Sequence, residues 1–199
     1  MKAKWILSIV AALLFGTMLN AQMSREQKGK RADEIITKIR RMDLANQILP
    51  LLLTNAQLDK LLPVIEKARN EGRKAEDIEY DMLVKLEGPV DAAIKEAYED
   101  QKLPKQETMG IVASTFKTMR IRRDAIIAEN VENVMAVLEK ELNAGQKKAA
   151  ANALQPSLFD PTLDASKMSD AEKMKFYTQA ILLDHEAYDV LLQIRTKRK

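Results

Sequence analysis

The sequence predicts an all-α fold: an elongated antiparallel hairpin of long helices, followed by an additional C-terminal helix. Ala, Leu, Ile, Lys, Glu and Met, all compatible with helices, dominate the composition. Gly and Pro, which interrupt helices, number only 6 each among 199 residues. Apolar residues recur at intervals of three and four along most of the chain, which is the period of an amphipathic helix. No segment shows the alternation that is typical of a strand.

The first 21 residues have the features of a secretory signal peptide. Lys2 and Lys4 precede an almost wholly apolar stretch, Trp5 to Leu19, and polar sequence begins directly after Ala21. We expect cleavage after Ala21 and a periplasmic or otherwise exported location. The alternative is an uncleaved membrane anchor, but the apolar stretch is shorter than the roughly 20 residues that a spanning helix needs. After cleavage, we expect no stable membrane insertion.

Composition excludes several classes of site. The chain has no Cys and one His, so it can form neither a disulfide framework nor a multi-histidine metal site. Loss of Lys2 and Lys4 lowers the net charge from +3 to +1, which is a poor basis for binding nucleic acid. No catalytic motif or phosphate-binding glycine loop is found. We therefore expect no enzyme activity, no cofactor and no metal, and we expect His185 to be structural or solvated.

Proline and glycine divide the helical sequence into segments. We expect a first helix from Ser24 to Leu49, ended by Pro50. A second helix begins after Thr54, and Gly88-Pro89 should break it and leave a shorter helix over residues 90–101. A long helix follows over residues 107–142. Further expected segments are a short helix to about residue 155, a loop over residues 156–167 and one last helix from Ser169.

The start of the second helix carries a complete capping motif. Thr54 is the expected N-cap, and Gln57, three residues later, closes a capping box with it. Leu53 and Leu58 flank the box as a hydrophobic staple. A second box, with Leu142 before Asn143 and Gln146, precedes the short helix, and a third, Ser169 with Glu172, starts the last helix. The box of Thr54 and Gln57 is expected to stabilise a helix start rather than to contact a ligand.

The pentapeptide starting at Leu53 matches L-T-x-x-Q, and the one starting at Leu142 nearly does, with Asn143 in place of Thr. Two such boxes around a long helix in an exported chain resemble the Spy/CpxP family of periplasmic proteins. The resemblance covers about residues 24–155. It implies a Spy/CpxP-like domain over residues 22–155, a bent helical hairpin that often pairs into a cradle-shaped dimer, with residues 156–199 as an addition. The family's metal-binding branch depends on His-rich positions that this chain lacks.

The resemblance implies one of two functions. Family members include an ATP-independent chaperone and an envelope-stress regulator that restrains a sensor kinase. We expect this chain to bind unfolded or partly folded envelope proteins. The alternatives are a regulator with one membrane partner and a structural helical protein. A homodimer would cover the apolar seam of the hairpin, and the added C-terminal helix could cover it instead.

Three arginines interrupt the apolar stripe of the long helix and mark the candidate client-binding surface. Mixed positive and apolar character suits weak, promiscuous binding. The candidate residues are Phe116, Met119, Arg120, Arg122, Arg123 and Ile127. The alternative is a solvated face on which the arginines pair with Asp124 and Glu129. The acidic run that includes Glu79 is also expected to be a solvated helix face, and Gly72 to permit close helix approach or to mark a weak point.

Overall fold

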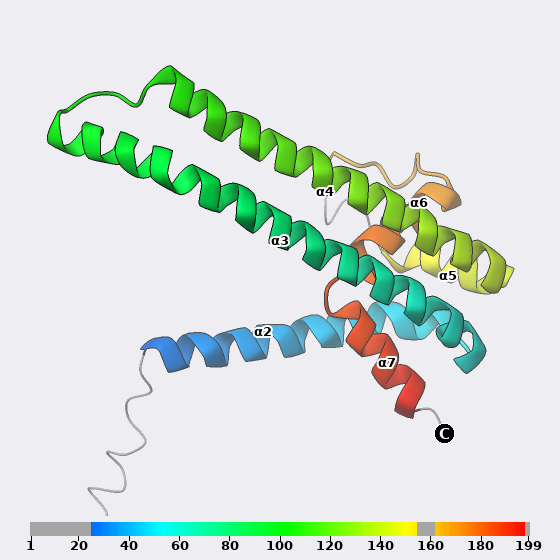
Figure 1. Ribbon diagram of the computed structural model, residues 1–199. Helices are drawn as coiled ribbons and strands as arrows, with labels where there is room; N and C mark the ends of the chain where they lie inside the picture. The colour runs from blue at the N-terminus through cyan, green and yellow to red at the C-terminus, as the bar shows by residue number, and fades with distance from the viewer. Residues whose placement is uncertain (1–24, 155–161, 198–199) are drawn as a thin grey trace, which may run out of the picture. The chain divides into compact units, whose positions relative to one another are not determined.

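The computed structural model describes residues 25–154 and 162–197, and every described regular element is helical (Figure 1). The expected signal peptide, residues 1–21, lies outside the described residues. None of the described helices is both long and apolar enough to cross a bilayer. The all-α fold is therefore confirmed. The chain divides into two compact units, Met1–Met42 and Asp43–Lys199.

The first unit contains most of α2 (Arg25–Ile48). Apolar residues spaced three and four apart on this helix are exposed there: Ile35, Ile39 and Met42 have 44%, 56% and 61% of their surfaces accessible. In the second unit, α2 ends one residue before its predicted end and continues as the short 3-10 helix η1 (Leu49–Leu51). Pro50 is accommodated in η1 because a proline near a helix start has no intrahelical hydrogen bond to lose.

The second unit is built around an antiparallel hairpin of α3 (Asn55–Glu99) and α4 (Gln106–Glu141), which run side by side in Figure 1. The expected break at Gly88-Pro89 is wrong, because α3 continues through both Pro63 and Pro89. Both prolines are on the exposed side of the helix. A carbonyl that loses its helical partner there is hydrated instead, so the helix survives the missing N–H.

The core lies at the end of the hairpin where α3 starts and α4 ends. There α5 (Ala144–Ala153), α6 (Asp170–Tyr177) and α7 (Ala187–Lys197) pack with α3, α4 and residues 44–53 around one buried cluster. Farther along the hairpin, α3 and α4 are the only described elements of the second unit that meet. Between residues 69 and 129, four residues are buried: Ala75, Glu79, Leu86 and Met119. Two helices alone can cover a single line of contacts, so most of this stretch stays open to solvent.

The C-terminal region is not the single helix that the sequence predicts. After α6 the chain forms a π-helical segment, η3 (Thr178–Leu182), then turns before α7. The Asp184 side chain accepts a hydrogen bond from the Glu186 N–H at 2.9 Å, and the Asp184 carbonyl accepts one from the Ala187 N–H. Such local bonds compete with helix continuation. The turn brings α7 onto α3, where Arg195 contacts Asp59 at 2.8 Å.

Candidate functional site

Both predicted LTxxQ-like boxes form in the structure. The Thr54 hydroxyl accepts a hydrogen bond from the Gln57 N–H at 3.2 Å, and the Gln57 side chain accepts one from the Thr54 N–H at 2.8 Å. Asn143 and Gln146 make the same reciprocal pair at 2.9 and 3.0 Å. Each box satisfies two N–H groups that a helix start leaves without partners.

The two boxes are also bonded to each other, which helical spacing does not predict. Gln57 Nε2 donates to Gln146 Oε1 at 2.9 Å, and Gln146 Nε2 donates to Gln57 Oε1 at 3.0 Å. Each amide then donates to the chain just before the other box: Gln57 to the Glu141 carbonyl at 2.7 Å, and Gln146 to the Leu51 carbonyl at 3.0 Å. Both amides therefore use both donor hydrogens and both acceptor positions, which is the full capacity of a glutamine, and Gln146 Nε2 also lies 3.5 Å from the Leu52 carbonyl.

The hydrophobic residues of the boxes lie in the same core beneath this amide pair. Leu53, Leu58 and Leu142 are 2%, 0% and 7% exposed and belong to the buried cluster. The linked boxes join the start of α3 to the end of α4 and the start of α5. The occurrence of the motif twice was the only signal in the sequence for this link.

The structure does not bring all six predicted client-binding residues onto one accessible surface. Phe116 is 54% exposed and Ile127 is 39% exposed, whereas Met119 is buried against α3. At about 100° per residue, Phe116, Arg120 and Ile127 lie on one side of the line along which α4 meets α3. Arg122 lies on the opposite side of that line.

Arg123 pairs with Glu79 of α3 and not with the acidic residues on its own helix. Its Nε donates to Glu79 Oε1 at 2.6 Å, and its Nη2 contacts Glu79 Oε2. Glu79 is 3% exposed, so its expected place on a solvated face is wrong. The Arg123 guanidinium hydrogen-bonds the Glu79 carboxylate and lowers the pKa of that carboxyl, while burial acts in the opposite direction. Arg123 is thus part of the hairpin's internal packing.

Helix α3 adds residues to the accessible side of the hairpin that the sequence analysis missed. In an antiparallel pair of helices, residues that follow the contact line by the same angle around each helix axis, counted in the direction of the chain, lie on the same side of the pair. Around the axis of α3, Tyr80 and Tyr98 lie about 100° beyond Glu79 in this direction. They are therefore on the side of the hairpin that carries Phe116 and Arg120. They are 67% and 83% exposed. We call this side the open face; its members are Tyr80, Leu83, Ile94 and Tyr98 of α3, and Met109, Phe116, Arg120 and Ile127 of α4.

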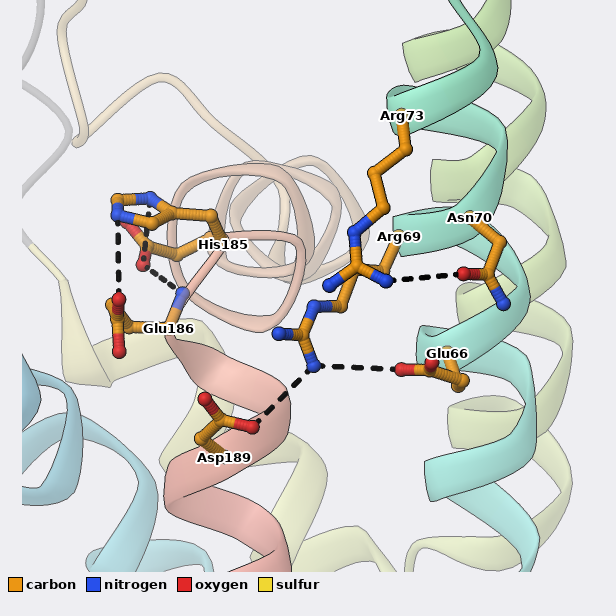
Figure 2. A network of polar contacts seen from close by, with 8 residues as sticks. Glu66, Arg69, Asn70, Arg73, His185, Glu186 and Asp189 are labelled. Atoms are coloured by element: carbon orange, nitrogen blue, oxygen red, sulfur yellow. Dashed lines mark hydrogen bonds and ion pairs between the residues drawn. The ribbon is translucent and has the colours of Figure 1, made fainter.

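A groove lies on the same side of the hairpin, nearer the core, where the turn before α7 meets α3 and α4. It has a volume of about 510 Å³. Figure 2 shows Arg69 and Arg73 extending from α3 toward His185, Glu186 and Asp189. Arg69 contacts Asp189 at 3.4 Å and lies 5.3 Å from the ring centre of Tyr188. The α3 wall of the groove therefore carries two arginines and Glu76, and the wall opposite carries Asp184 and Glu186.

Apolar side chains and one buried amide form the interior of this groove. The apolar part comes from three segments of the second unit and consists of Ile65, Ala68, Ile126, Ile127, Leu183 and Tyr188. Asn130 also lines the groove and is 5% exposed. No hydrogen bond joins its side-chain amide to another described residue. Gly72 lines the groove too, and a Cβ at that position would meet no atom within 4 Å, so Gly72 is not a point of close helix approach.

His185 stands at the rim of the groove with its side chain 80% exposed. Its Nδ1 is 3.6 Å from Asp184 Oδ1, and its Nε2 is 3.7 Å from Glu186 Oε1. Within residues 25–154 and 162–197, no group of three or more His, Cys, Asp or Glu side chains is placed to hold a metal ion.

Comparison of the chain with protein-family models, with curated proteins and with solved structures finds no match in any of the three.

Proposed function

We propose that this chain is an exported, ATP-independent chaperone-like protein that binds partly unfolded proteins on the open face of the α3–α4 hairpin. The observation that supports this function is the accessible apolar surface of the open face. Tyr98, Phe116 and Met109 are each more than half exposed, on a stretch of the hairpin over which no other described element of the second unit packs. Large exposed apolar surfaces of this kind are typical of interaction sites.

The chemistry of the open face favours many weak partners over one tight partner. Aromatic rings and Met109 provide adaptable apolar contact, and Arg120 adds a positive charge that pairs with carboxylates or stacks on rings. Flexible, mixed surfaces accept different sequences because no single polar arrangement is demanded. Release from such a surface needs no nucleotide.

The proposal includes membership of the Spy/CpxP family and export by a cleaved signal peptide. The linked pair of LTxxQ-like boxes and the hairpin between them support the family assignment. A homodimer that covers part of the open face is included as well, because each isolated hairpin leaves that surface accessible.

The test uses the chain from Gln22 onward with two unrelated aggregation-prone clients, without ATP, at low and high salt. We expect suppression of aggregation for both clients, reduced at high salt because the arginine contribution is screened. Phe116→Ser and Arg120→Ala should weaken suppression. Ile121→Ser is the matched control, since Ile121 is 56% exposed on the outer side of α4.

Failure to protect either client would overturn the chaperone proposal. Protection that Ile121→Ser reduces as much as Phe116→Ser would overturn the open face as the binding surface. Sedimentation velocity on the same variants measures self-association, and a dimer that is insensitive to Phe116→Ser would exclude the open face as the dimer contact.

A further inference from the structure

The groove beside α7 carries a polar group that the fold leaves without a partner. Asn130 is 5% exposed, yet its side-chain amide makes no hydrogen bond to a described residue. Among the described residues, the fully enclosed side-chain atoms without a partner belong to Asn55, Glu66 and Asn133, so the Asn130 amide keeps contact with solvent in the groove and is free to bond a ligand there. The amide faces a space of about 510 Å³, which is within the range of roughly 300–1,000 Å³ for sites that enclose ligands.

The chemistry of the groove narrows the class of ligand. Ile65, Ile126 and Leu183 provide an apolar surface, so the ligand must have an apolar part. An amide presents one acceptor and two donor hydrogens, which complements a group that both donates and accepts. A peptide unit has this character, with its N–H and C=O.

The charges that line the groove are of both signs. Arg73 and Glu76 stand on the α3 side, and Glu186 stands on the opposite side. A simple anion or cation would meet a like charge as well as an opposite one. An uncharged peptide unit meets no such like charge, so it is the ligand group that we favour.

We propose that the groove binds one large apolar side chain of an extended polypeptide, with the adjoining backbone amide hydrogen-bonded to Asn130. The proposal rests on the proposed function, because the occupant is a segment of a partly unfolded client. It adds a defined side-chain pocket at one end of the otherwise shallow open face. Ile127 lines the groove and belongs to the open face, so the two surfaces are continuous.

Gly72 offers a direct way to close the groove. A Cβ there meets no atom within 4 Å, so Gly72→Leu places a side chain into the groove without a backbone clash. Leucine also favours a helix more than glycine does, so the variant should fold at least as well. Gly88→Leu is the matched control, because a Cβ there is also free and lies about 180° from the α4-facing side of α3.

The probe is the end-capped peptide Gly-Ser-Leu-Phe-Leu-Ser-Gly, labelled with fluorescein. A second version of the peptide is N-methylated at Phe. Binding of each peptide is followed by fluorescence anisotropy. We expect Gly72→Leu to raise Kd by about tenfold and Gly88→Leu by less than about twofold. Asn130→Leu should weaken the unmodified peptide about fivefold and the N-methylated peptide by less, because the N-methylated peptide has already lost the Phe N–H that would donate to the Asn130 amide oxygen.

An unchanged Kd for Gly72→Leu would overturn the groove proposal. Equal losses of affinity for both peptides with Asn130→Leu would overturn it as well. A Gly72→Leu variant that loses only self-association in sedimentation velocity would also overturn it, since a second copy of the chain would then be the occupant of the groove. The chaperone proposal is judged separately: client protection that survives Gly72→Leu but fails with Phe116→Ser leaves that proposal standing without the groove. If peptide binding depends on Gly72 but the protein protects no client, the groove proposal holds and the chaperone proposal fails.

Discussion

The side-chain amides of Gln57 and Gln146 donate hydrogen bonds to each other's oxygens, at 2.9 and 3.0 Å, across 89 residues of sequence. Each glutamine also closes its own capping box. The same two side chains thus start two helices and hold the two starts together. A closed network in which every donor and acceptor is used tolerates no single replacement well.

Removing either glutamine amide should destabilise the protein. Removing both should lower the free energy of unfolding by less than the sum of the two single losses. We expect Gln57→Leu and Gln146→Leu each to lower the free energy of unfolding by about 2–3 kcal/mol, because backbone N–H and C=O groups lose their partners. The double variant should show a coupling of about 1–2 kcal/mol. Urea unfolding measures all three.

Gln193→Leu is the control for this cycle, since Gln193 is exposed on α7. It should change the free energy of unfolding by less than about 0.5 kcal/mol. Strictly additive losses for Gln57 and Gln146 would contradict the direct link between the boxes.

The ion pair between Arg123 and Glu79 should respond unequally to loss of its two members. Arg123→Leu leaves the Glu79 carboxylate, which is 3% exposed, without a partner. We expect a loss of about 2 kcal/mol, which is less than for a fully buried pair because the Arg123 side of this pair is exposed to water. Glu79→Leu should change the free energy of unfolding by less than about 1 kcal/mol, since the Arg123 side chain is 59% exposed and remains hydrated.

Thermal or urea unfolding of the two variants decides this prediction, and equal losses would contradict it. The result also matters for client binding. A triple replacement of Arg120, Arg122 and Arg123 would alter the hairpin itself, so Arg120→Ala is the informative change.

The same pair should make the protein less stable in acid. The Arg123 guanidinium holds the pKa of Glu79 below its ordinary value of 4.5 in the folded protein. A carboxyl with a lowered pKa stabilises the fold above its ordinary pKa, and this contribution is lost as pH falls through the folded value. The difference in unfolding free energy between the wild type and Glu79→Gln should therefore be constant near neutral pH and shrink below about pH 4.5. A difference that grows in acid would refute the assignment.

Replacing the proline inside α3 should stabilise the protein. Pro89 has no N–H for the Lys85 carbonyl, and both residues lie on the exposed side of a continuous helix. Pro89→Ala should raise the free energy of unfolding by roughly 1–3 kcal/mol. Pro104→Ala, in the connection between α3 and α4, should give no such gain. If Pro89→Ala gave none either, the helix would have to be interrupted at that point.

Local chemistry alone determined where several helices begin. Thr54 with Gln57, Asn143 with Gln146, and Ser169 with Glu172 each act within four residues, so the capping boxes could be read directly from the sequence. The long helix over residues 107–142 followed in the same way from its apolar period, and its observed bounds differ by one residue.

Only the tertiary structure decided which of these local features meet. Pro89 ends no helix because its side of α3 is solvated, and the last helix breaks because the turn at Asp184 carries α7 onto α3. Glu79 finds Arg123 across 44 residues, and Gln57 finds Gln146 across 89. Helical periodicity shows which residues share a face of one helix, but it contains no information about which other helix packs against that face. Packing between helices sets those pairs, and with them the open face and the groove.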